Sequence, residues 1–336
     1  MKKSNCFFID KKDINFVQTL MCGQIFSYKQ FKDKFLILSA NKKAEVFELK
    51  TNYKIVTADI NYFKNFFDLK TDYEKIKQDL LKDYDNDIIK KVIKLKPVET
   101  KLKPIETKLN SVEKKFRLNK KNLNFLLDGE KKNFKVKNFS SKNLQNDILK
   151  KAIKFGSGIR ILKQELLEVI ISFVFSANNN IKRITDSLFK LRERFGTKLN
   201  DFFAFPTLNQ LQKVSEKDFK EIGAGYRSVQ LVKLIKQLKN IDLEEFKNLE
   251  TEVLRKKLIN LSGIGPKVAD CILLFGFGRT DVFPVDTWIK QVFNLYFEKN
   301  EDKTQIRKFL IKKFGYLSGY AQQYLFDYQR SYVNKK

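Results

Sequence analysis

Residues 261–286 read LSGIGPKVADCILLFGFGRTDVFPVD and contain a glycine turn, SGIGPK, between two helical patterns. The pattern ETEVLRKKLINL leads into the turn, and VADCILLFGF leads out of it. Gly263 and Gly265 permit positive φ and let the backbone approach a neighbour closely. Pro266 suits the first position of a helix, where its missing N–H costs nothing. The stretch therefore predicts a helix-hairpin-helix.

The hairpin has the features of a phosphate-binding turn. The free N–H groups at a helix start bind anions, and the helix dipole assists them. We expect Gly263, Ile264, Gly265 and Lys267 to hold a nucleic-acid backbone. Phosphate contacts carry no sequence preference. A hairpin of this kind also suits a non-catalytic DNA-binding protein, in which the lysine only meets phosphate.

The second feature is an amine followed by a carboxylate. Asp286 lies 286 − 267 = 19 residues after Lys267. A helix N-terminus and a following apolar run both favour the neutral form of a lysine, which can attack a sugar C1′ and form a Schiff base. An ionised aspartate nearby would stabilise the positive charge that develops as a glycosidic bond breaks. The pair favours an enzyme that removes a base from DNA.

More motifs occur in order along the chain. They are CGQIF (22–26), SFVFSANNNIKRI (172–184), GAGYR (223–227), KVADC (267–271) and GYAQQYLF (319–326). Together with the hairpin and its downstream P-V-D, they resemble the 8-oxoguanine DNA glycosylase family of helix-hairpin-helix glycosylases with lyase activity. The resemblance covers most of the chain. It implies that Lys267 is the nucleophile and Asp286 the charge-stabilising carboxylate.

The same resemblance implies four residues for the lesion base. Gly23 would offer its backbone carbonyl to the N7–H that 8-oxoguanine has and guanine lacks. With guanine that buried carbonyl would stay unpaired, at a cost of about 1–3 kcal/mol. Phe326 would stack on one face of the flipped base, and Cys271 would lie against the other. Gln322 would read the Watson–Crick edge. Taken alone, Cys271 and Phe326 also suit a hydrophobic core.

Four further residues resemble those that act on the opposite strand. Asn178, Arg183 and Arg227 would hold the orphaned cytosine, and Tyr226 would fill the gap in the base stack. Arginine donors suit the acceptors of cytosine, and a good contact contributes about 1–3 kcal/mol of discrimination. The base must leave the helix because its C1′ is unreachable inside the duplex. Asn178 also suits a helix N-cap cluster.

The sequence departs from the family in one respect. It contains no histidine, whereas eukaryotic relatives place one soon after the catalytic aspartate, where it meets a phosphate. Here Thr287 and Trp288 follow, and Lys290 is a candidate replacement. A histidine general base is therefore excluded. Proton transfer would use Asp286, Lys267 or the released base.

Composition narrows the partners and cofactors. The formal net charge of +28 predicts a polyanionic partner, and the resemblance implies that this partner is double-stranded DNA containing 8-oxoguanine. The three cysteines show no zinc or iron–sulfur spacing, so we expect no metal and no other cofactor. The sequence shows no apolar run of about 20 residues and no signal peptide. We expect a monomer without membrane contact, in the cytoplasm or, in a eukaryote, the nucleus.

The organisation predicts an α+β fold. Short alternating runs over residues 1–60 indicate an N-terminal antiparallel sheet, which includes QIFSY at residues 24–28. Residues 61–94 would be a helical segment, and residues 146–336 a two-lobed helical glycosylase domain. Residues 95–145 are lysine-rich and begin with a tandem repeat, KLKPVET (94–100) followed at once by KLKPIET (101–107). We interpret them as a mobile insertion that duplicated part of its flank, since NDIIKKVIK recurs as NDILKKAIK; a nonspecific DNA tether is the alternative.

These observations favour a bifunctional glycosylase/AP lyase that acts on 8-oxoguanine, preferentially opposite cytosine. Two alternatives stay open at this point. One is a glycosylase of the same superfamily that removes oxidised pyrimidines, and the other is a catalytically silent helix-hairpin-helix protein that only binds DNA.

Overall fold

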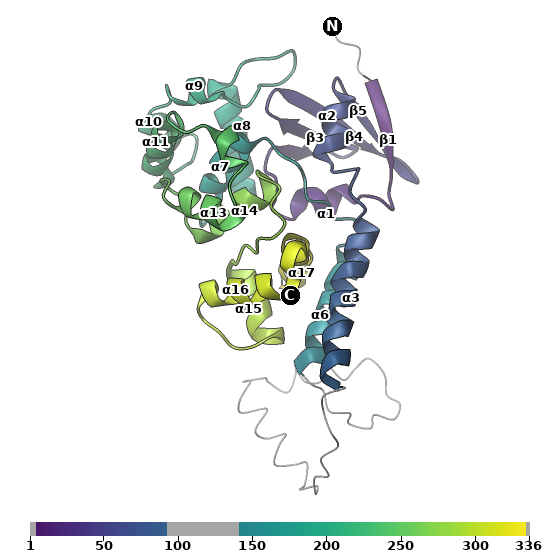
Figure 1. Ribbon diagram of the computed structural model, residues 1–336. Helices are drawn as coiled ribbons and strands as arrows, with labels where there is room; N and C mark the ends of the chain where they lie inside the picture. Colours follow the sequence, from purple (N-terminus) through teal and green to yellow (C-terminus); the bar gives the residue numbers. More distant parts are fainter. Residues whose placement is uncertain (1–4, 93–140, 334–336) are drawn as a thin grey trace, which may run out of the picture.

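The computed structural model describes residues 5–92 and 141–333 (Figure 1). It has the predicted α+β architecture, with an N-terminal antiparallel sheet joined to a helical body. Most of the predicted insertion at 95–145 lies outside the described residues, but its last residues belong to a helix that begins at Ser141. Within the described ranges, no helix combines the length and apolar character needed to cross a membrane.

Five strands of the described chain form one antiparallel sheet in the order β1-β5-β4-β3-β2. They are β1 (Asn5–Asp10), β2 (Tyr28–Gln30), β3 (Lys34–Ser39), β4 (Lys42–Glu48) and β5 (Asn52–Thr57). Alternate residues of β5 are buried, namely Tyr53, Ile55 and Thr57, as expected for a sheet with one covered face. Helices α1 (Phe16–Met21) and α2 (Ile60–Phe66) supply aromatic side chains to the same core.

The predicted strand at 24–28 is wrong for all but its last residue, Tyr28. The preceding backbone turns instead, because the buried amide of Gln24 bridges distant segments. Its Nε2 donates to the carbonyls of Thr19 at 2.9 Å and Arg160 at 2.8 Å, and its Oε1 accepts from the N–H of Leu162 at 2.8 Å. This bridge holds the segment around Gly23 against the start of the helical body.

Two long helices, α3 (Tyr73–Val92) and α6 (Ser141–Phe155), pack beside one another and extend from the body (Figure 1). The second copy of the repeated segment lies in α6, and its residues Ile148, Leu149, Ala152 and Ile153 are buried. The second copy thus supplies core contacts to the helical body.

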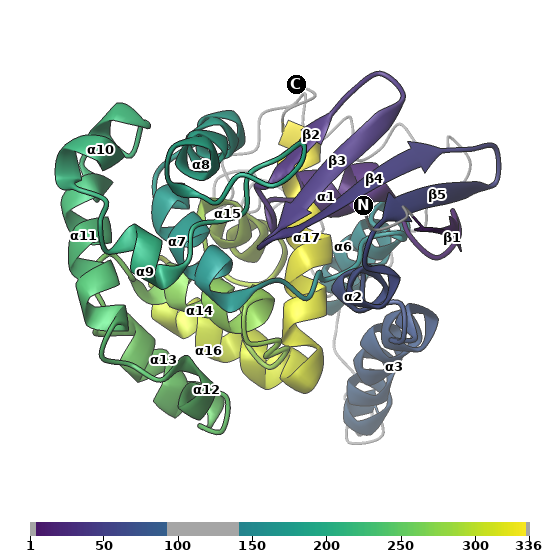
Figure 2. The ribbon, with the colours of Figure 1, turned by 90° about the horizontal axis from the view of Figure 1, so that it is seen from above.

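The helical body contains two hydrophobic cores. The first is built by α7 (Leu166–Ser176), α8 (Ile181–Phe195), α9 (Leu208–Leu211), α10 (Glu216–Glu221), α11 (Arg227–Leu238), α12 (Leu243–Phe246), α13 (Thr251–Ile259) and α14 (Pro266–Phe275). The second is built by α15 (Thr287–Tyr296), α16 (Lys303–Phe314), η1 (Gly315–Leu317) and α17 (Ser318–Val333), together with α3 and α6. In Figure 2, α17 crosses the middle of the view, with α8 to α13 on one side.

A buried ion pair fixes the sheet to the first helical core. Glu168 of α7 accepts from Arg192 of α8 at 2.5 Å and from the Ser27 hydroxyl at 2.5 Å. Its other oxygen accepts from the backbone N–H of Ala40 at 2.9 Å. Removing one partner of such a pair costs about 3–5 kcal/mol because the other charge stays buried. The pair therefore ties Ser27, before β2, and Ala40, between β3 and β4, to α7 and α8.

Candidate active site

The predicted hairpin is present between α13 and α14. Gly263 has φ +80°, and an added Cβ would lie 3.1 Å from Val174 Cγ1, so this position requires glycine. Gly265 does not use its conformational freedom, because its φ is −84°. It is the N-cap of α14, makes no side-chain cap, and an added Cβ there would meet nothing within 4 Å. The N–H groups that begin α14 therefore face an open approach, as a phosphate site requires.

We predict that Gly265→Ala leaves folding almost intact but weakens DNA binding about tenfold. The backbone angles of residue 265 suit alanine, so stability should change by about 1 kcal/mol or less. The new methyl group would occupy the path of the phosphate and weaken its charge-assisted hydrogen bonds. Thermal unfolding and fluorescence anisotropy with a DNA duplex measure the two effects. Gly263→Ala is the contrasting variant and should mainly lose stability; unchanged affinity in Gly265→Ala would contradict the assignment of the turn.

Lys267 lies at the second position of α14, directly after Pro266. Its side chain is half-buried, and its Nζ lies 5.5 Å from the centroid of the Phe173 ring. Cys271 follows one helical turn later and is buried. Burial raises the pKa of the Cys271 thiol to about 11, and the charge and hydrogen bond of Lys267 oppose this shift. The amine is thus held against the protein, beside a neutral thiol.

Asp286 lies at the start of α15, where its carboxylate forms the N-cap and accepts from the N–H of Ile289 at 2.9 Å. Burial raises the pKa of Asp286, whereas the Ile289 N–H and the positive charge of Lys267 lower it. Lys267 is therefore within electrostatic reach of the carboxylate. Asp286 caps a helix and also interacts electrostatically with the amine, so its structural and chemical roles are compatible.

The site lies where the two helical cores meet. Val282 belongs to the first core, and Phe283 and Val285 belong to the second, so the connection from α14 to Asp286 crosses from one core to the other. Lys267 comes from a helix of the first core, and Asp286 begins a helix of the second. The packing of these two cores therefore sets the separation of amine and carboxylate.

Three of the predicted lesion-binding residues come from opposite ends of the chain. Gly23 has φ +80°, and an added Cβ would lie 3.7 Å from the ring of Phe326. Gln322 is buried one turn earlier in α17, and its Nε2 donates to the carbonyl of Pro284 at 3.4 Å. The Oε1 of Gln322 accepts from Gln323 at 2.8 Å. The fold thus brings Gly23 to Phe326 and ties Gln322 to the loop before Asp286.

The predicted opposite-strand residues form a second group. Tyr226 is 59% exposed, and Arg183 is exposed on the first turn of α8. Asn178 has φ +50°, in the loop between α7 and α8. Arg227 is buried, donates to the carbonyls of Ala177 and Asn178, and stacks 4.4 Å from the Tyr226 ring centroid. In this structure the Arg227 guanidinium therefore holds the loop, while Tyr226 and Arg183 face solvent.

Lys290, the candidate replacement for the missing histidine, forms an ion pair with Glu301. This pairing lowers the pKa of the Glu301 carboxyl. The Lys290 ammonium would have to leave this partner to meet a phosphate.

A buried ionic cluster beside the site was not predicted from the sequence. Asp270, adjacent to Cys271 in α14, accepts from Arg255 of α13 at 2.7 Å and from Arg307 of α16 at 3.0 Å. Arg307 also donates to Glu252 at 2.7 Å. Asp270 in the KVADC motif could have indicated this cluster, but its partners Arg255 and Arg307 lie in other helices and cannot be identified from the motif. The cluster locks α14 between α13 and α16.

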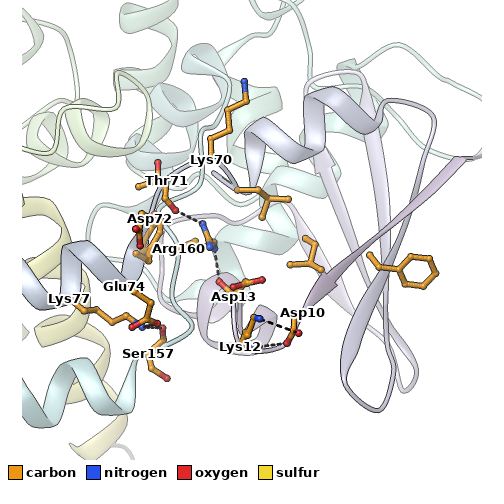
Figure 3. Close-up of a pocket in the computed structure, with 14 residues that line it drawn as sticks. Asp10, Lys12, Asp13, Lys70, Thr71, Asp72, Glu74, Lys77, Ser157 and Arg160 are labelled. Atoms are coloured by element: carbon orange, nitrogen blue, oxygen red, sulfur yellow. Dashed lines mark hydrogen bonds and ion pairs between the residues drawn. The ribbon is translucent and has the colours of Figure 1, made fainter.

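A separate hollow lies away from these residues, between the β1–α1 and α2–α3 connections (Figure 3). Arg160 lines it and donates to the carbonyls of Asp13 and Asp68, each at 2.6 Å. None of the predicted site residues lines this hollow. Its arginine holds the two connections together.

The hairpin, the lysine and the aspartate together indicate the class of protein to which the chain belongs. Residues 171–315 match the family model described as HhH-GPD superfamily base excision DNA repair protein. Residues 6–170 match the model described as 8-oxoguanine DNA glycosylase, N-terminal domain. The fold and site are thus those of a helix-hairpin-helix base excision repair glycosylase. Within this class, the chain belongs to the 8-oxoguanine DNA glycosylase family.

Similar proteins agree with this assignment. A probable N-glycosylase/DNA lyase of Methanothermobacter thermautotrophicus is 30% identical over 56% of this chain and 68% of its own length. An N-glycosylase/DNA lyase of Arabidopsis thaliana is 33% identical over 54% of this chain and 57% of its own length, so the match spans little more than half of that protein. The 8-oxoguanine glycosylase/lyase of Clostridium acetobutylicum, solved with double-stranded DNA containing cytosine opposite 8-oxoG, has a TM-score of 0.74 at 27% identity. That structural match covers 99% of this chain and 98% of the other.

Proposed function

We propose that this protein is a bifunctional glycosylase/AP lyase that removes 8-oxoguanine from duplex DNA, preferentially opposite cytosine, through a Schiff base on Lys267. The observation that carries the proposal is the position of Lys267, which is half-buried at the junction of the two helical cores, beside Cys271 and within electrostatic reach of Asp286. An amine and a carboxylate beside an open phosphate-binding turn suit chemistry at a deoxyribose.

Base removal would begin with attack of the neutral Lys267 amine on C1′. A bond forms between Nζ and C1′, the C1′–N9 bond breaks, and the base leaves with that electron pair and takes up a proton. Positive charge develops at C1′ and O4′ during this step. The carboxylate of Asp286 would stabilise this charge, as a fixed anion in a partly water-excluded site does most effectively.

Strand cleavage would follow from the covalent intermediate. Opening of the sugar ring gives an imine between Lys267 and C1′, which acidifies the C2′–H. Loss of that proton and breakage of the C3′–O bond expel the 3′ phosphate by β-elimination, and water then releases the enzyme. Since the sequence contains no histidine and the Lys267 nitrogen is committed to the imine, the proton acceptor would be Asp286 or the released base.

Recognition of the lesion would depend on three groups around the flipped base. The carbonyl of Gly23 would accept the N7–H of 8-oxoguanine, and the Phe326 ring beside it would stack on the base. The neutral Cys271 thiol would offer a soft apolar surface to the other face. With guanine, the carbonyl would lose its donor, which disfavours the undamaged base by about 1–3 kcal/mol.

A nicking assay tests the proposal. Duplexes carrying 8-oxoguanine opposite each of the four bases, and one carrying an oxidised pyrimidine, are incubated with the full chain under single-turnover conditions. We expect fastest cleavage with 8-oxoguanine opposite cytosine. Preferred cleavage at the pyrimidine would support the related glycosylase activity instead. Tight duplex binding without base release would support a non-catalytic DNA-binding protein.

Arg183 gives a prediction on the opposite strand. Its side chain is exposed beside the α7–α8 loop, so we expect Arg183→Ala to fold normally. The variant should reduce the preference for cytosine by about 1–3 kcal/mol, because a guanidinium that donates to cytosine acceptors would be lost. Excision rates opposite each of the four bases measure this preference. Lys182→Ala is the matched control one residue earlier, and an unchanged preference in Arg183→Ala would remove the assigned role.

A further inference from the structure

Arg330 lies at the edge of the lesion-binding residues and was not singled out from the sequence. It is one helical turn after Phe326 in α17, and its guanidinium carbon lies 5.4 Å from the centroid of the Phe326 ring. Its Nη1 would lie 3.6 Å from a Cβ added to Gly23. The side chain is 17% exposed. One guanidinium thus lies beside both the residue whose carbonyl would read N7–H and the ring that would stack on the base.

The same guanidinium also closes the end of a helix. Arg330 Nη2 donates to the carbonyl of Met21, the last residue of α1. Carbonyls at a helix C-terminus lack donors within the helix and need partners from elsewhere. Met21 is two residues before Gly23, so this bond fixes the exit of α1 and the backbone that carries the Gly23 carbonyl. The bond from Arg330 to Met21 therefore joins the C-terminal helix α17 to the N-terminal helix α1.

An acidic neighbour accompanies the arginine. Asp327 is buried, and its Oδ1 lies 3.7 Å from Arg330 Nη2. Burial raises the pKa of Asp327 to about 6, and Arg330 opposes the shift. Cys22, between Met21 and Gly23, is buried close enough for both groups to act on the pKa of its thiol. Arg330 is therefore held by a carboxylate, an aromatic ring and a backbone carbonyl, which leaves it little freedom to move.

We propose that Arg330 is a positioning residue that fixes the Gly23 carbonyl relative to the Phe326 ring and thereby sets the discrimination between 8-oxoguanine and guanine. The inference rests on the proposed function. Discrimination by one carbonyl needs that acceptor at hydrogen-bonding distance from N7–H while the base is stacked. A carbonyl free to turn away would lose the lesion contact and would also tolerate guanine.

The test compares two reactions of one enzyme. Excision of 8-oxoguanine opposite cytosine needs the base-binding residues, whereas cleavage of a preformed abasic site needs Lys267 but no base. In Arg330→Met, which keeps an unbranched apolar stem without the guanidinium donors, we expect single-turnover excision to fall about 10- to 100-fold. Abasic-site cleavage and borohydride trapping should change by less than about threefold. The affinity ratio for duplexes with 8-oxoguanine over guanine should fall in parallel.

Two further variants keep the test decisive. Arg330→Lys retains a donor and a positive charge and should recover part of the lost excision. Arg279→Met is the matched control, since Arg279 also donates to two backbone carbonyls, those of Lys247 and Leu249 in the connection between α12 and α13. Equal loss of both reactions in Arg330→Met and in Arg330→Lys, or unimpaired excision in Arg330→Met, would overturn the proposal. If the unaltered protein cleaves abasic sites but does not excise 8-oxoguanine, the proposed substrate is wrong instead.

Discussion

Lys267→Gln protein is expected to bind lesion-containing duplex DNA but neither to excise the base nor to form a borohydride-stable complex. Glutamine is polar and one atom shorter than lysine, but it is uncharged and its amide nitrogen is not nucleophilic. Removing the nucleophile of a covalent mechanism lowers the rate by about a thousandfold or more. The measurement is gel analysis of strand cleavage and of covalent enzyme–DNA complex after reduction.

Lys303→Gln is the control for this experiment. Lys303 is exposed at the start of α16, and its charge acts on the pKa of Asp286, so it is another amine near the site. We expect trapping to persist in Lys303→Gln and to vanish in Lys267→Gln. The opposite result would assign the nucleophile to Lys303 of α16 instead of Lys267 of α14.

The second large effect is expected for Asp286→Asn. Asparagine is a good N-cap, so α15 should keep its start and the protein its fold. The negative charge opposite the developing cation would be lost, and we expect excision to slow about 100- to 1,000-fold. Single-turnover excision and duplex affinity are the two measurements, and affinity should stay close to that of the unaltered protein.

A comparison with Asp286→Ala separates the two roles of this residue. Alanine removes both charge and cap and should cost a further 0.5–2 kcal/mol or so in stability.

The pH dependence of excision gives an independent test of the role of Asp286. Burial raises the pKa of Asp286, so protonation on acidification should slow excision at a pH above the usual carboxyl range. Undiminished excision in Asp286→Asn would show that the side chain serves only as the N-cap of α15 and that its charge does not stabilise the developing cation.

Local patterns in the sequence predict the hairpin well. Gly263 adopts the positive φ that glycine permits, and Pro266 occupies the first turn of α14. These outcomes depend on neighbours within a few residues, where turn chemistry and capping dominate. The sheet is predicted for a similar reason, since alternation in β5 corresponds directly to a covered and an open face.

Long-range polar contacts are not predictable in this way. The segment around Gln24 does not continue as a strand because its amide bonds to Arg160 and Leu162, which follow α3 and α6 in the chain. Arg330 finds a carbonyl 309 positions earlier in the chain. No periodicity or propensity encodes such pairs, because each depends on packing that forms only in the folded state.

Arg227 illustrates the same limit at the site itself. The motif GAGYR places an arginine beside Tyr226, and the resemblance implies a contact with cytosine. In the folded chain the guanidinium is buried against the carbonyls of Ala177 and Asn178. The motif identifies the residue, while its arrangement before DNA binds depends on the α7–α8 loop.

The bare N-terminus of α14 has a consequence for how this protein can change. A capping side chain at residue 265 would satisfy the waiting N–H groups and stabilise the free protein by about a few tenths of a kcal/mol. The same side chain would compete with phosphate. A laboratory selection for thermal stability alone would therefore enrich substitutions at Gly265 that weaken DNA binding, since stability favours a capping side chain there and phosphate binding favours its absence.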